Sequence, residues 1–123
     1  MKELLKILIP LLAIFESNGN PNAYNNKENA AGILQIRPIM IKDCNRISGE
    51  STYYLKDRWN EEKSYHMAIT YLNHYGKKHL TSNMTEEEKI VILARMWNGG
   101  PNGWKKKSTL SYGEKIRKLY KGK

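Results

Sequence analysis

The chain has 123 residues, of which 40% are hydrophobic, and this length suits one globular domain with a single core. It is too short for a multidomain enzyme or for a separate cofactor-binding domain. The net charge of +9 favours a polyanionic partner, such as nucleic acid, anionic lipid or an anionic cell-wall polymer, although a merely solubilising surface explains it equally well.

Disulfide and metal chemistry have little support in the sequence. Cys44 is the lone cysteine, so the chain cannot form an internal disulfide. The three histidines, His66, His74 and His79, are scattered and lack the spacing of a metal site. We therefore expect no metal and no cofactor.

An apolar run from Leu4 to Phe15 predicts the first helix, and Asn18-Gly19-Asn20-Pro21 predicts its end. The run imitates a short secretory signal, but Glu3, Pro10 and the lack of an Ala-x-Ala cleavage site favour a buried helix. It is also too short to span a bilayer. Pro10 is expected either to kink this helix or to lie in the first turn of a second helical segment.

Glu16 falls in the last turn of this helix, where a carboxylate is unexpected. The negative end of the helix dipole and burial beside Ile14 and Phe15 would both disfavour its charged form. Both effects are expected to raise the pKa of the side chain, which suits a general acid near neutral pH. A solvated glutamate at a fraying helix end is the simpler alternative, because most charged side chains are exposed.

The middle of the chain predicts loops and short helices. The asparagines between Asn18 and Asn29 favour turns, and this stretch is long enough to form the wall of a cleft. Apolar residues recur at helical spacing from Ala30 to Ile47 and are divided by Pro38, which predicts a short helix, a turn and a second helix. The polar and aromatic segment from Ser48 to Asn60 predicts an irregular connection with no legible function.

The second half of the chain predicts three amphipathic helices. The first runs from Glu61 to about Tyr75 and ends at Gly76. Thr85-Glu86-Glu87-Glu88 is a capping-box pattern that opens a strongly apolar helix, which ends at Gly99-Gly100-Pro101. Ser111 to Glu114 has the same pattern and predicts the start of a short C-terminal helix.

Three short motifs occur where these helices meet loops, and they could converge on one groove. They are Glu16-Ser17, Gly32-Ile33-Leu34-Gln35 and Trp97-Asn98-Gly99-Gly100. In this order they resemble the lysozyme-like domain of the soluble lytic transglycosylases, which is related to goose-type lysozymes. Trp97 stands where the family commonly has a tyrosine, and Tyr112 matches the family's late tyrosine. The resemblance covers nearly the whole chain.

The resemblance implies a mainly α, lysozyme-like single domain over residues 1–123, with a substrate groove and little or no β-sheet. It also implies cleavage of the bond between N-acetylmuramic acid and N-acetylglucosamine in peptidoglycan. Glu16 would protonate the leaving oxygen and then act as the base toward the muramyl 6-hydroxyl, which gives a 1,6-anhydro product. In a hydrolytic lysozyme, water would attack instead.

The motifs also suggest which residues bind the substrate. The predicted set is Ser17, Leu34, Gln35, Trp97, Asn98 and Tyr112. The amides of Gln35 and Asn98 offer sugars both donors and acceptors. Trp97, Tyr24 and Tyr112 could present aromatic faces to sugar rings or complete the core, and for Trp97 packing in the core is at least as well supported.

A second carboxylate, which hydrolysis with inversion requires, has no clear candidate. Glu28 and Asp43 are the acids nearest to the motifs in the sequence, and neither has a compelling context. This favours the transglycosylase reaction, which needs one acid.

Two other functions are left open by the sequence. A non-catalytic wall-binding or structural module could keep the same fold, and the charge together with Lys105-Lys106-Lys107 would suit a nucleic-acid binder. Charge alone does not explain three ordered motifs, so we expect peptidoglycan glycan strands as the partner and no nucleic acid. We also expect a monomer. Action in the periplasm or cell wall is expected, without a cleavable signal peptide, after delivery by a phage or a secretion channel or release from the cytoplasm.

Overall fold

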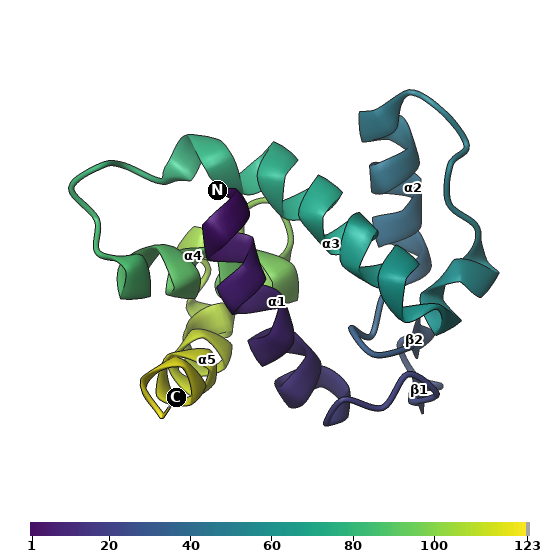
Figure 1. Ribbon diagram of the computed structural model, residues 1–123, viewed down its shortest axis with the longest axis horizontal. Helices are drawn as coiled ribbons and strands as arrows, with labels where there is room; N and C mark the ends of the chain where they lie inside the picture. Colours follow the sequence, from purple (N-terminus) through teal and green to yellow (C-terminus); the bar gives the residue numbers. More distant parts are fainter. Residues whose placement is uncertain (123) are drawn as a thin grey trace. The chain divides into compact units, whose positions relative to one another are not determined.

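The computed structural model describes residues 1–122, so residue 123 of the predicted domain lies outside the described residues. Five α-helices and one small two-stranded sheet form the described chain, together with four short 3-10 helices (Figure 1). The helices are α1 (Lys2–Ser17), α2 (Pro38–Ser48), α3 (Glu61–Gly76), α4 (Glu86–Gly99) and α5 (Leu110–Lys121). The 3-10 helices are η1 (Leu55–Trp59), η2 (Lys77–His79), η3 (Gly103–Lys105) and η4 (Lys107–Thr109). The prediction of a mainly α fold is confirmed.

The sheet is a hairpin of two-residue strands. β1 (Tyr24–Asn25) pairs antiparallel with β2 (Ala30–Ala31), and Tyr24 lies opposite Ala31. Strands this short contribute little stability of their own. Other contacts must therefore hold the hairpin in place.

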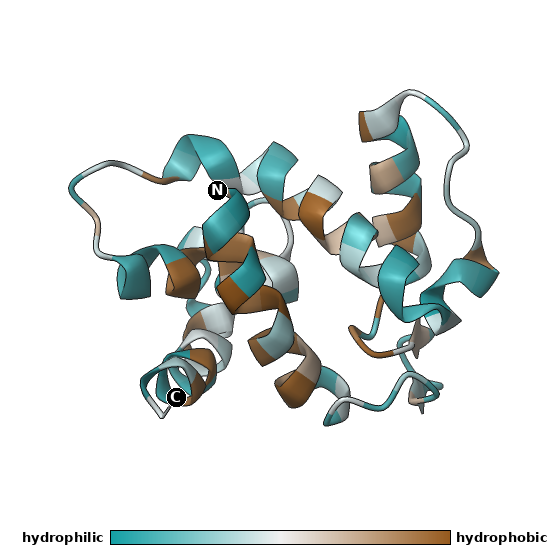
Figure 2. Ribbon diagram, viewed as in Figure 1, coloured by the Kyte–Doolittle hydropathy of each residue, from teal (hydrophilic) through white to brown (hydrophobic). Residues whose placement is uncertain are grey.

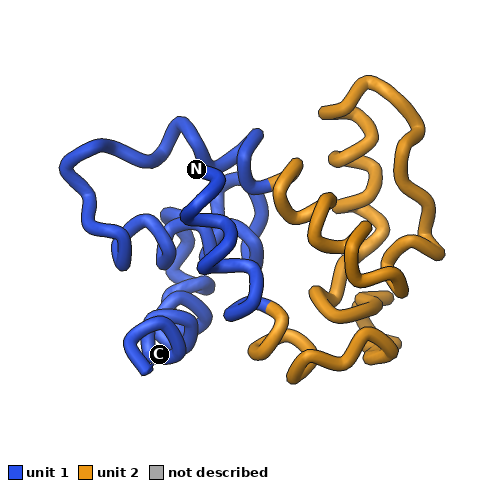
Figure 3. The backbone as a smooth tube through the Cα atoms, in the orientation of Figure 1, with its two compact units in different colours: residues 1–12, 72–123 blue, residues 13–71 orange. Residues whose placement is uncertain are grey.

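The described chain divides into two compact units, shown in separate colours in Figure 3. Unit 1 comprises residues 1–12 and 72–123, and unit 2 comprises residues 13–71. The backbone passes from unit 1 to unit 2 within α1 and returns within α3. One domain over 1–123 stays a prediction.

The apolar run near the N-terminus forms α1, in which brown, hydrophobic segments alternate with teal, hydrophilic ones in Figure 2. Its buried residues are Leu5, Leu8, Ile9, Leu11, Leu12 and Ala13. Pro10 lies inside this one continuous helix, so the alternative of a second helical segment is wrong. None of the helices in the described part of the chain is long and apolar enough to cross a membrane.

In unit 1, α4 packs against α5 and against the short helices η3 and η4. The buried residues of α4 are Ile90, Leu93, Ala94, Met96 and Trp97, which agrees with the strongly apolar helix predicted from the sequence. The capping box of α4 is confirmed, because Thr85 Oγ1 accepts from the backbone of Glu88 at 3.1 Å and Glu88 Oε1 accepts from the backbone of Thr85 at 2.8 Å. This reciprocal pair satisfies two amide groups at the end of the helix.

The second predicted capping box is wrong. The helix α5 already begins at Leu110, and η4 leads directly into it, so Ser111 lies within the helix rather than before it. Thr109 occupies the capping position, but its hydroxyl instead donates to the carbonyl of Gly103 at 2.6 Å. The preceding 3-10 turn takes the place of a side-chain cap.

The short helix predicted after Ala30 is also wrong, because residues 32–35 form a turn. The backbone of Gln35 donates to Gly32 at 3.1 Å, and Ala31 and Ile36 exchange two backbone bonds of 3.1 and 3.0 Å. Gly32 and Gln35 have φ values of +85° and +53°, in the left-handed region that a right-handed helix cannot use. Pro38 then begins α2. Proline is tolerated at this position because the first N–H groups of a helix have no partner within the helix.

Replacing Thr85 by alanine should lower the free energy of unfolding by about 1 kcal/mol, because α4 loses its cap. Denaturant unfolding followed by circular dichroism measures the change. Ser111→Ala is the matched control, and we expect little effect because its hydroxyl caps no helix. An equal loss from both substitutions would contradict the start of α5 described above.

Candidate active site

The last turn of α1 carries Glu16 and Ser17, as the sequence predicts. The helix stops where Asn18 and Gly19 adopt φ values of 56° and 77°, and the amide of Gly19 donates to the carbonyl of Ala13 at 3.1 Å. Such a left-handed ending satisfies carbonyls that the helix leaves unpaired. Glu16 is therefore fixed on a helix that ends one residue later.

The expected burial of Glu16 beside Ile14 and Phe15 is wrong. Ile14 is 44% exposed and Phe15 is 38% exposed, because the buried face of α1 runs through Leu11, Leu12 and Ala13. Glu16 itself is half-buried. A carboxylate in this position can still reach a ligand.

Ser17 joins the end of α1 to the turn at residues 32–35. Its hydroxyl donates to the carbonyl of Ile33 at 2.7 Å and accepts from the backbone of Asn20 at 3.1 Å. The sequence predicts that Ser17 binds substrate, which stays a prediction. The contacts hold Ser17, the residue next to Glu16, against the turn that carries Gln35.

Gln35 is held inside the same turn by its own side chain. Its Nε2 donates to the carbonyl of Gly32 at 2.9 Å and to the carbonyl of Ala23 at 3.1 Å. Both bonds use the amide nitrogen, so the carbonyl oxygen Oε1 is the atom that can accept a hydrogen bond from a sugar. The neighbouring Leu34 is fully buried, so any contact of Leu34 with substrate would involve its backbone.

Gly32 gives the turn its tight fit against η1. A Cβ atom at this position would lie 1.8 Å from the carbonyl oxygen of Arg58, and the φ of +85° is itself unfavourable for other residues. The amide of Gly32 also donates to the carbonyl of Ala23 at 2.8 Å. Glycine is therefore required here by both conformation and space.

Arg58 is a buried residue that sequence reasoning missed. Its guanidinium donates to the carbonyls of Asn29 at 2.6 Å, Leu55 at 3.0 Å and Ile36 at 3.1 Å. Burial lowers the pKa of this side chain from its ordinary value, whereas Tyr24 nearby acts in the opposite direction. No pattern in the polar segment around it indicates this role.

The predicted residues of unit 1 lie on α4 and α5. Trp97 and Tyr112 are buried, with 3% and 7% of their surfaces exposed, whereas Asn98 in the last turn of α4 is exposed. The burial of Trp97 agrees with its alternative role in the core. Of the three, Asn98 has the side chain most accessible to a ligand.

The structure thus groups the predicted site residues within each unit. Unit 2 contains Glu16, Ser17, Leu34 and Gln35, and unit 1 contains Trp97, Asn98 and Tyr112. Their convergence on one groove stays a prediction, as do their contacts with substrate.

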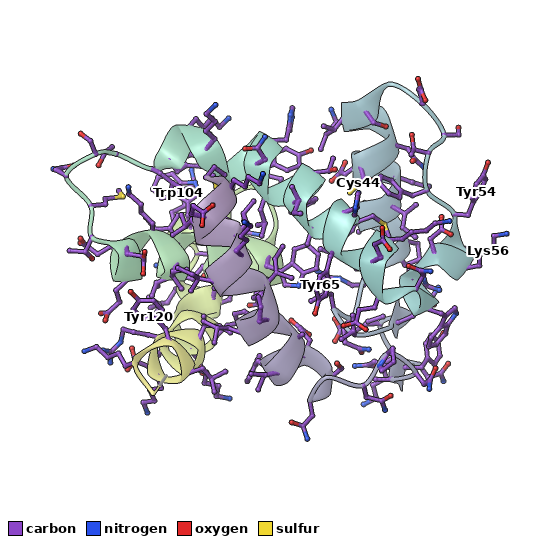
Figure 4. All side chains as sticks on the ribbon, viewed as in Figure 1. Cys44, Tyr54, Lys56, Tyr65, Trp104 and Tyr120 are labelled. Atoms are coloured by element: carbon purple, nitrogen blue, oxygen red, sulfur yellow. The ribbon has the colours of Figure 1, made fainter. Side chains whose placement is uncertain are left out.

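The other ionisable groups considered from the sequence have local roles. Glu28 pairs with Arg37 at 3.6 Å, and Asp43 pairs with Arg46 at 3.4 Å. Cys44 on α2 (Figure 4) is buried, and its thiol donates to the carbonyl of Met67 at 3.4 Å. Burial, with a smaller effect of Asp43, raises the pKa of this thiol to about 12, so it is not a nucleophile near neutral pH.

A comparison with known families identifies the class of protein. The model described as the transglycosylase SLT domain matches residues 1–120, so the chain belongs to this family. Membership supports a peptidoglycan-cleaving function of the lytic transglycosylase type in general. Comparisons with curated proteins and with solved structures give no match.

Substituting Gly32 by alanine should lower the free energy of unfolding by about 3 kcal/mol or more, because the new methyl group clashes with the carbonyl of Arg58. Gly49→Ala is the matched control, since Gly49 has a φ of +79° with nothing within 4 Å of the added atom. In the control, the free energy of unfolding should fall by only about 1 kcal/mol, which is the cost of placing alanine in the left-handed conformation. Equal losses in denaturant unfolding would contradict the constraint imposed by Arg58.

Proposed function

We propose that the protein is a lytic transglycosylase that cleaves the β-1,4 bond between N-acetylmuramic acid and N-acetylglucosamine. Glu16 serves as the single acid and base. The observation that carries the proposal is the family match over residues 1–120, together with an acid at the end of α1 beside the residue that holds the Gln35 turn.

In the first step the protonated carboxyl of Glu16 donates its proton to the glycosidic oxygen. The bond from the anomeric carbon to that oxygen breaks, and the muramyl ring develops oxocarbenium character. Oε1 of Gln35 accepts a hydrogen bond from a hydroxyl or N-acetyl group of the sugar. Because Gln35 is held by two backbone carbonyls, little of its side-chain freedom is lost on binding.

In the second step the Glu16 carboxylate removes the proton from the muramyl 6-hydroxyl. The oxygen attacks the anomeric carbon and closes the 1,6-anhydro ring, and Glu16 is left protonated for the next cycle. The reaction consumes no water. Its products together have the same composition as the substrate.

The surroundings of the other candidate acids support a one-acid reaction. Glu28 and Asp43 each lie beside an arginine, Arg37 and Arg46 respectively. The two pairs, with nitrogen–oxygen distances of 3.6 and 3.4 Å, have the geometry of ordinary ion pairs. These acids therefore have a structural partner of their own and need no catalytic role to explain them.

Glu16→Gln should reduce the rate of peptidoglycan cleavage by about 10² to 10⁴-fold, because glutamine keeps the shape of the side chain but has no proton to donate. The release of soluble fragments from a purified peptidoglycan suspension measures the rate. Glu62→Gln removes an exposed acid from α3 and is the matched control, with a rate near that of the parent. Equal clearing by the parent and Glu16→Gln would rule out the catalytic role.

The products should carry anhydromuramyl ends when the digest is analysed by mass spectrometry. Because water takes no part, digestion in isotopically labelled water should place no label in these ends. A hydrolytic lysozyme acting on the same peptidoglycan provides the comparison, since it must incorporate one oxygen from water. Labelled, reducing muramic acid ends from this protein would assign it to the lysozymes instead.

A further inference from the structure

Two aromatic side chains of unit 2 lie side by side in the solvent. The rings of Tyr24 on β1 and Trp59 at the end of η1 have centroids 6.0 Å apart and planes inclined by 42°. Tyr24 is 49% exposed and Trp59 is 42% exposed. Two adjacent, half-exposed rings present flat apolar faces against which a ligand can pack.

The two rings are anchored on one hydrogen-bonded network. The hydroxyl of Tyr24 donates to Oδ1 of Asn29 at 2.9 Å, and Nη1 of Arg58 donates to the same oxygen at 3.4 Å. Arg58 also holds the carbonyl of Asn29 and directly precedes Trp59 in the chain. A ligand would therefore meet rings that are already positioned, which lowers the entropic cost of binding.

The surroundings of the pair suit a carbohydrate better than an apolar ligand. Exposed asparagine side chains lie on either side of β1, at Asn22 and Asn26, and can hydrogen-bond to hydroxyl and acetamido groups. Aromatic faces pack against the C–H faces of pyranose rings, so the two kinds of group match the two kinds of surface on a sugar. Exposed Lys27 and Lys56 add positive charge, which complements the carboxylates of peptidoglycan.

The pair is also structurally continuous with the candidate active site. Ala23, the residue before Tyr24, accepts hydrogen bonds through its carbonyl from Gln35 at 3.1 Å and from Gly32 at 2.8 Å. The same turn receives the hydroxyl of Ser17 next to Glu16. The aromatic pair and the Gln35 turn are therefore joined through the backbone of Ala23.

We infer that Tyr24 and Trp59 form a sugar-binding subsite for a pyranose ring of the glycan strand, outside the residues that carry out bond cleavage. The choice of a glycan rests on the proposed function. The subsite increases the affinity for the glycan strand and helps to position it, and it takes no part in proton transfer.

The test measures binding of an uncharged β-1,4-linked N-acetylglucosamine tetrasaccharide, which avoids non-specific attraction to a chain of net charge +9. Binding is followed by tryptophan fluorescence and calorimetry in the Glu16→Gln background, so that no cleavage occurs. Trp59→Ala and Tyr24→Ala should each weaken the affinity about tenfold, which corresponds to about 1.4 kcal/mol. Tyr24→Phe keeps the ring and should retain most of the affinity.

Ile39→Ala removes a side chain from α2 that is 64% exposed and is the matched control, with unchanged affinity. Circular dichroism establishes that each variant is folded. Equal affinity in folded Trp59→Ala and Ile39→Ala, or no binding by the Glu16→Gln protein, would overturn the subsite. A dimer in sedimentation velocity that Trp59→Ala disrupts without a change in sugar affinity would overturn it too.

The cleavage assay separates this inference from the proposed function. Loss of tetrasaccharide binding in Trp59→Ala, with no cleavage of peptidoglycan by the parent, would support the subsite and refute the enzyme. Cleavage that depends on Glu16, with tetrasaccharide affinity independent of Trp59 and Tyr24, would support the enzyme and refute the subsite.

Discussion

The arrangement of unit 2 depends on the buried guanidinium of Arg58. It donates to backbone carbonyls of Asn29, Ile36 and Leu55, which belong to three different segments of the chain. The two-residue strands are too short to keep the hairpin in its position by themselves. A buried charge is costly unless it is well hydrogen-bonded, and here the cation donates to three backbone carbonyls.

This anchoring brings together the two unlike structural elements that the proposed reaction uses. The candidate acid is on the end of a helix, whereas the amide of Gln35 is on a turn with a left-handed backbone. The hydrogen bond from Ser17 to Ile33 connects them, and Gly32 lets the turn approach η1 closely. In the proposed reaction, residues held in this way would need less ordering when a substrate arrives.

Local signals in the sequence predict the helices well and the hairpin poorly. Gly76 and the Thr85 capping box act within a few residues, so the ends of α3 and α4 follow from the sequence. The spacing of apolar residues after Ala30 imitates a helix, but the turn there depends on Arg58, far along the chain. The order of the motifs predicts the family, which the family match confirms, and Glu16 as the acid, which stays a prediction. Trp59 lies in a segment whose polar composition gives no sign of its environment.

The order of the two units along the chain bears on biosynthesis. Unit 2 consists of consecutive residues, so the ribosome has made Glu16, the hairpin and Arg58 before α4 exists. Unit 1 needs both ends of the chain, and joining them closes a loop that contains all of unit 2. Such closure has an entropic cost that only later contacts offset, so the contacts that join Ser17 to the turn and Arg58 to the hairpin can form during translation, before Asn98 has been added.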